Sequence, residues 1–269
     1  MSHIHIPDGV LPFWLWGAGW IAALALVALA SRMSARADVR RKVPLLGVVA
    51  ALMLVSMSSE IVPLAYHINL TVVAGVLLGP WLGIIAAFIV EVILAMIGHG
   101  GVTVIGLNTL MIGTETALGW ALVRGLVRLL GRRRIRPAAF IATILTLATT
   151  TTLLVGLVSL AGGGAATTRE TGALDPSTLR FENPFSRGVF SVNALRGEEK
   201  APPRPEAYLS VRRFAAVVYT LGPIGWVMEA LVTAGVLGYV ARVRPTLVFA
   251  GALAEERHTE PGHHMEGRP

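Results

Sequence analysis

Long apolar runs with almost no charge recur along this chain of 269 residues, and they constrain its fold more than any other feature. About 20 consecutive apolar residues can cross the hydrocarbon core of a bilayer as a helix. A segment in lipid must satisfy its backbone hydrogen bonds internally, which favours α-helices. The predicted segments are 11–30, 44–64, 68–79, 82–97, 102–124, 137–161 and 213–241. The sequence therefore predicts an all-α polytopic membrane protein, a single membrane domain with about seven transmembrane helices.

Composition supports this class. Only 14% of the residues are charged and 54% are hydrophobic, whereas a soluble domain carries about a quarter charged residues. The chain has no cysteine, which excludes disulfides and thiolate metal sites. The net charge of +7 does not indicate a nucleic-acid partner, because the basic residues lie in short clusters between the apolar runs.

The basic clusters predict the orientation, since lysine and arginine in short loops face the cytoplasm. They are Arg32, Arg36, Arg40, Arg41 and Lys42; Arg128, Arg132, Arg133, Arg134 and Arg136; and Arg242 with Arg244. With seven spans, all three clusters fall inside if the N-terminus is outside and the C-terminus inside. We then expect a long outer loop at 162–211, a cytoplasmic tail at 246–269, and a multi-pass location in the cell (inner) membrane. The first residues lack the basic start of a signal peptide, so we expect the N-terminus to be retained.

This topology gathers four histidines at the outer face: His3, His5, His67 and His99. Imidazole is a good ligand for nickel, cobalt, copper and zinc. Two readings are open, a shared metal site or single polar residues at helix ends. The tail histidines His258, His263 and His264 are expected to lie in a flexible polar end.

Four glutamates interrupt the apolar segments: Glu60, Glu91, Glu115 and Glu229. Ionisable groups inside a membrane are costly and suggest a function. They favour either a proton relay, as in a secondary ion carrier that needs no partner, or carboxyl groups that hydrogen-bond across helices. Glycines at 75, 79, 83, 113 and 119 predict close helix packing.

Two enzyme classes find no support in the sequence. The metalloprotease motif HExxH is missing, and His67 is followed by Ile68 and Asn69. The phosphate loop GxxxxGK[ST] is missing too, so we do not expect the chain to hydrolyse ATP by that route.

Several motifs together resemble one family. They are HIPDG at 5–9, His67, LLGPW at 77–81, GHGGVTVIGLN at 98–108, the stretch from Pro223 to Glu229, and RVRP at 242–245. The chain resembles the CbiM/NikM family, the substrate-binding membrane components of energy-coupling factor transporters for cobalt and nickel. HIPDG is the most specific of these motifs.

The resemblance implies a substrate-capture subunit of an ABC importer for cobalt(II) or nickel(II), with the metal as substrate and no bound cofactor. It implies partners as well: a transmembrane coupling subunit, ATPase subunits, and a small accessory membrane subunit that the 162–211 loop could dock. In the family an N-terminal amine, a backbone amide, the first histidine and a second histidine hold the metal. The matching histidines here are His5 and His67, while Asp8 and Asn108 would support the ligands from outside.

The start of the chain departs from the family pattern, in which histidine is the second residue. Here Met1, Ser2, His3 and Ile4 precede His5. If Met1 is removed, the Ser2 amine and the His3 amide and ring can form the chelate, with His5 and His67 nearby. Alternatively, His5 and His67 bind the metal, aided by His3 or His99, without an amine. The sequence leaves both arrangements open.

Overall fold

A computed structural model describes residues 13–34, 42–59, 67–97, 101–162 and 211–249, and these residues form helices and short connections without a β-strand. The α-helices are α1 (Phe13–Ser34), α3 (Val43–Ser58), α4 (Thr71–Leu78), α5 (Pro80–Met96), α6 (Ile105–Leu130), α7 (Ile135–Gly162) and α8 (Val211–Val243). A 3-10 turn, η1 (Arg132–Arg134), joins α6 to α7. The all-α membrane class predicted from the sequence is confirmed.

Helix length separates the apolar segments into two groups. The stretches Phe13–Ser34, Ile105–Leu130, Arg132–Leu160 and Ala215–Val243 are long and apolar enough to cross a membrane, and α3 and α5 are shorter apolar helices. Only eight residues of the predicted segment 68–79 are helical, and they form α4. At 1.5 Å per residue, α4 extends about 12 Å, less than half of a bilayer core of about 30 Å. Seven crossings, with the N-terminus outside, stay a prediction.

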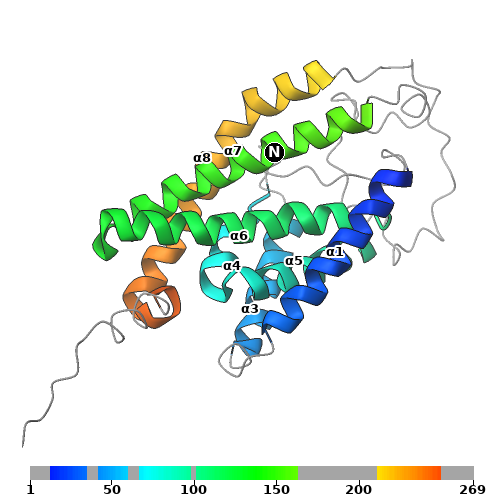
Figure 1. The fold of residues 1–269 in the computed structure, drawn as a ribbon. Helices are drawn as coiled ribbons and strands as arrows, with labels where there is room; N and C mark the ends of the chain where they lie inside the picture. The colour runs from blue at the N-terminus through cyan, green and yellow to red at the C-terminus, as the bar shows by residue number, and fades with distance from the viewer. Residues whose placement is uncertain (1–12, 35–41, 60–66, 98–100, 163–210, 250–269) are drawn as a thin grey trace, which may run out of the picture.

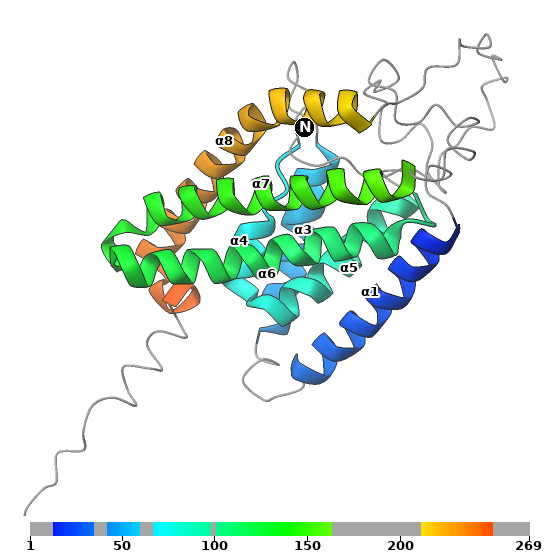
Figure 2. The ribbon, with the colours of Figure 1, turned by 45° about the horizontal axis from the view of Figure 1, so that its top comes forward.

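Helix α6 is the centre of the arrangement, because it packs against α1, α4, α5 and α7. Figures 1 and 2 show α6 and α7 running side by side, with α8 against α7. Helices α3 and α4 pack on α5 and on each other. The short helices α4 and α5 therefore sit within a frame of longer ones.

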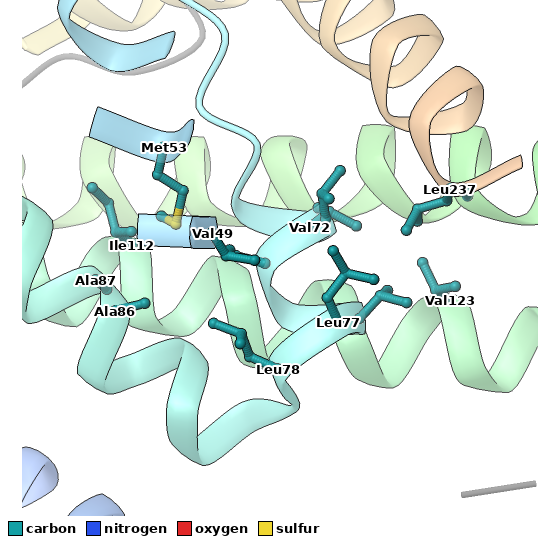
Figure 3. Close-up of a cluster of buried hydrophobic side chains, with 14 of the residues drawn as sticks. Val49, Met53, Val72, Leu77, Leu78, Ala86, Ala87, Ile112, Val123 and Leu237 are labelled. Carbon is teal, nitrogen blue, oxygen red and sulfur yellow. The ribbon is translucent and has the colours of Figure 1, made fainter. Parts of the chain in front are cut away.

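The main core lies where α3, α4, α5, α6, α7 and α8 meet. Figure 3 shows Met53, Val72, Ile112, Val123 and Leu237 converging there from these helices. Every residue of α4 is buried, so this helix forms part of the core itself. Lipid is as apolar as these side chains, so close packing holds the helices together in place of a hydrophobic driving force.

Glycines provide the closest of these contacts, as predicted. A Cβ at Gly75 of α4 would overlap the backbone carbonyl of Thr116 on α6, and a Cβ at Gly119 would lie 2.8 Å from the Val72 side chain. Gly79 is different, and the packing prediction is wrong for it. No atom lies within 4 Å of its ideal Cβ, and its φ of 83° forms the turn between α4 and α5.

Candidate metal centre

His67 is the predicted metal ligand that the structure describes. It lies in the short non-helical stretch 67–70 that leads into α4. The side chain is half-buried, and its Nδ1 atom is shielded from solvent. A partly shielded imidazole before a rigid helix has a defined direction, which a metal ligand needs.

The remaining predicted site residues fall in two groups. Ser2, His3, His5, Asp8 and His99 lie outside the described residues. Asn108 is described; it is buried in the first turn of α6, where its backbone N–H donates to the carbonyl of Val104 at 2.9 Å. Within the described part of the chain, no group of three His, Asp or Glu side chains could hold a metal ion. The shared imidazole site therefore stays a prediction.

A buried hydrogen-bond cluster fixes the start of α4, four residues after His67. Thr71 Oγ1 donates to Glu115 Oε2 at 2.9 Å, and Thr150 Oγ1 donates to Glu115 Oε1 at 2.7 Å. Thr150 has one hydroxyl proton, so its longer approaches to carbonyls of its own helix are secondary. The cluster ties α4 to α6 and α7, and so holds the stretch that carries His67.

The backbone before α4 adds a second constraint. Leu70 has a φ of 56°, the one non-glycine residue with positive φ in the described parts of the chain. This conformation costs about 1 kcal/mol or more for a leucine and persists only where neighbours enforce it. The Leu70 carbonyl accepts from the N–H of Ala74 at 2.9 Å, which starts the helix. The chain thus turns sharply between His67 and α4.

Asn69 is the unexpected polar residue of this stretch. Its side chain is fully buried, and neither amide atom has a hydrogen-bond partner within the parts of the chain that the structure describes. A buried amide without a partner is costly, and each such group calls for an explanation. Its place two residues after His67 makes it a candidate member of the site. No sequence motif marks a lone asparagine as a site residue, so this position could not be predicted.

Close packing joins the first half of α1 to the first turn of α6. A Cβ at Gly106 would lie 2.6 Å from the Trp20 Cα, and Gly19 packs against Leu107. Phe13, the first described residue of α1, lies about 9 Å along the helix from Gly19.

An apolar cluster closes this end of the bundle. It consists of Leu15, Val104, Leu107, Leu154, Val158 and Val218. These residues come from the first turns of α1 and α6, the last part of α7 and the first part of α8. The residues from α1, α7 and α8 therefore form an apolar lid over the start of α6.

A family model described as "Cobalt uptake substrate-specific transmembrane region" matches residues 5–247, nearly the whole chain. The chain belongs to the CbiM family. The match begins at His5, so the four residues before it, from Met1 to Ile4, lie outside the matched region.

Two curated relatives of this CbiM chain illustrate its range. "Cobalt transport protein CbiM" from Sorangium cellulosum is 32% identical over 206 residues, which cover 71% of this chain and 89% of the relative. "Putative metal transport protein HQ_3621A" from Haloquadratum walsbyi is 29% identical over 251 residues, which cover 91% and 94%.

Solved structures show the same fold. A structure titled "Crystal Structure of an transition metal transporter" has a TM-score of 0.61, and a truncated form has 0.57. Both are 18% identical to this CbiM chain and cover 93% and 89% of it. The chain is thus a transmembrane component for cobalt or transition-metal uptake.

The intramembrane glutamates of this CbiM protein divide by environment. Glu115 accepts hydrogen bonds from two other helices, which agrees with the cross-helix reading of these residues. Glu91 on α5 and Glu229 on α8 are each 1% exposed, and Glu60 lies outside the described residues.

Proposed function

We propose that this chain captures cobalt(II) or nickel(II) at the outer membrane face as the substrate-specific subunit of an energy-coupling factor ABC importer. The family match over residues 5–247 carries this proposal. It includes both His5 and His67, the two histidines of the implied ligand set. Imidazole and amine or amide nitrogens are donors that suit these two ions.

The placement of His67 supports the proposal. The Glu115 cluster and the turn at Leu70 hold its stretch firmly, and α1, which follows His5 in the sequence, packs against the first turn of α6. A site built from a fixed histidine and an incoming N-terminal segment would close when the metal joins them. Binding would weaken in acid, because the imidazoles must lose their protons to bind the metal.

We further propose that energy comes from separate subunits, a transmembrane coupling subunit and ATPases in the same cell membrane. The sequence contains no phosphate loop, so its own contribution to transport would be capture and release. The alternative is a carrier driven by protons through intramembrane glutamates. Both carboxyl oxygens of Glu115 accept hydrogen bonds, from Thr71 and Thr150. Glu115 therefore gives less support to the proton-driven carrier.

Uptake of radiolabelled cobalt and nickel into cells tests the division of labour. The chain is expressed with intact partner subunits, or with an ATPase partner whose phosphate-loop lysine is replaced. We expect uptake with the intact ATPase and background uptake with the inactive one. Uptake that continues with the inactive ATPase and stops when a protonophore is added would overturn the proposal in favour of the proton-driven carrier.

A further inference from the structure

A cavity of about 280 Å³ lies at the end of the bundle opposite the apolar lid over α6. It is bounded by the start of α3, the turn between α4 and α5, the last turns of α6, the start of α7 and residues 247–249. The lining residues that matter here are Lys42, Trp81, Trp120, Arg124, Arg128 and Phe249. Figure 1 shows the end of α8 coming round to the connection between α6 and α7.

The cavity combines an apolar interior with a cationic rim. Its walls include Val76, Leu82, Val123 and Val127, and none of the described residues that line it is an aspartate or glutamate. The cations are Lys42, Arg124 and Arg128. Such a lining suits a ligand with one anionic group and an apolar chain.

Aromatic contacts hold two sides of the cavity in place. The Arg124 guanidinium lies 5.4 Å from the centre of the Trp120 ring. The Arg132 guanidinium lies 5.7 Å from the Phe249 ring, which anchors the residues after α8 over the cavity. Both distances fall within the range of cation–π attraction.

Lys42 is half-buried, as is Arg124. Its Nζ donates to the Leu77 carbonyl, the last turn of α4, over a long 3.4 Å. Burial lowers the pKa of its ammonium group, because the charged form is poorly solvated there. A carbonyl brings only a partial charge, so a full anion next to Lys42 would stabilise this ammonium better.

The surroundings favour a lipid over a protein segment. The arginines of η1 lie at this end of the bundle, which the positive-inside rule predicts to be cytoplasmic. The cytoplasmic leaflet is rich in anionic lipids, and basic pockets between transmembrane helices bind their headgroups.

We propose that this cavity binds an anionic phospholipid, with the phosphate between Lys42, Arg124 and Arg128 and an acyl chain along the aliphatic walls. The lipid would connect α3, α6 and the residues after α8 at the predicted cytoplasmic surface. This site is separate from the metal centre, and it goes beyond the proposed function.

Native mass spectrometry of the purified full chain tests the proposal. The protein is mixed with equal amounts of phosphatidylglycerol and phosphatidylcholine, and the retained lipid is measured. We expect phosphatidylglycerol to be preferred about tenfold, because phosphatidylcholine carries the same phosphate together with a cationic choline group that the three basic side chains repel. The double variant R124Q/R128Q should lose this preference, whereas R133Q/R134Q, at exposed arginines of η1 that do not line the cavity, should keep it.

A second pair of variants tests the cavity itself. Val127→Phe fills the apolar interior and leaves all charges in place, so retained lipid should fall; Leu129→Phe, two residues further at an exposed position, should change nothing. Equal retention of both lipids by the parent, or unchanged retention by R124Q/R128Q, overturns the proposal. The proposal is also overturned if R124Q/R128Q, co-purified with its partners, loses the coupling subunit while the amount of retained lipid is unchanged. The metal affinity of the same variants is measured as a control and should be unchanged. The outcome of this test then does not depend on the transport proposal.

Discussion

Glu115 illustrates how a carboxyl group is accommodated inside a membrane bundle. Both of its oxygens accept hydrogen bonds from threonines on other helices, and the residue is fully buried. An unsatisfied carboxyl group at such depth would cost several kcal/mol in solvation. The two threonines offset part of this cost and also join α4 to α6 and α7.

Neighbouring threonines on α7 provide a matched test of this cluster. We expect Thr150→Val to lower the free energy of unfolding by about 1–2 kcal/mol, since one buried carboxyl oxygen loses its donor. Thr149 is exposed and donates only to the Leu145 carbonyl of its own helix, so Thr149→Val should change stability by less than about 0.5 kcal/mol. Thermal unfolding in detergent measures both. Equal effects of the two variants would contradict the role given to Glu115.

Asn69 offers a second test at the residue scale. Asn69→Leu should keep or raise thermal stability, because it removes a buried amide that has no partner among the described residues. Metal affinity should nevertheless fall by about tenfold, the usual effect of losing a residue that supports a ligand. Thr233→Val, at another buried polar atom without a described partner but on α8, should leave metal affinity unchanged. A variant Asn69→Leu that is less stable and binds metal normally would show a purely structural role.

The sequence predicted part of this neighbourhood, and the rest escaped prediction for a physical reason. His67 stands out because imidazole is a distinctive ligand and the residue lies at a predicted helix end. Glu115 stands out as an acidic residue in an apolar segment, and it makes the hydrogen bonds across helices that were one of its two expected roles. Thr71 and Asn69 carry no such signal, since threonine and asparagine are common at helix ends. The role of Thr71 depends on burial next to Glu115, 44 residues away, which only the packed helices reveal.

At the scale of helices, glycine decides how closely elements approach. Gly106 lets α1 reach the first turn of α6, and its position toward the Trp20 backbone leaves no room for a methyl group. Gly125, on the same helix, has no atom within 4 Å of its ideal Cβ. Replacing each of the two glycines by alanine therefore distinguishes the effect of helix packing from the effect of intrinsic helix propensity.

We expect Gly106→Ala to destabilise the protein by about 1–3 kcal/mol, because α1 must shift away from α6. Metal affinity should fall with it, since α1 positions the N-terminal ligands of the proposed site. Gly125→Ala should be neutral or stabilising by up to about 1 kcal/mol, because alanine favours the helix. Thermal unfolding and metal dialysis of both variants measure these effects. If Gly106→Ala is destabilised but its metal affinity is unchanged, α1 does not contribute to the metal site.

Helix positions followed from the apolar pattern more closely than helix lengths did. Each of the seven predicted segments overlaps one helix, yet 68–79 begins with a non-helical stretch and holds a helix of only eight residues. The apolar run continues through both parts because both are buried. Burial explains the apolar composition of this segment. The turn at Leu70 depends on tertiary contacts instead, so no local pattern in the sequence marks it.

The topology of the whole molecule can be tested because the chain has no native cysteine. We expect Ser59→Cys, just after α3, to react with a membrane-impermeant maleimide in intact cells. Arg134→Cys, in the turn between α6 and α7, should react only after the membrane is permeabilised. Both positions are exposed, so access to the reagent depends on the side of the membrane. The reverse labelling would place the N-terminus inside and the proposed metal site on the wrong face.

The central claim is that His67 helps to hold the transported metal, and equilibrium dialysis of the purified full chain with nickel or cobalt tests it most directly. We predict that His67→Ala weakens binding by more than about a hundredfold, beyond the loss expected for a merely supporting residue. The matched control replaces His258, His263 and His264 of the tail by alanine and should bind as the parent does. Binding by His67→Ala equal to that of the parent would contradict the account.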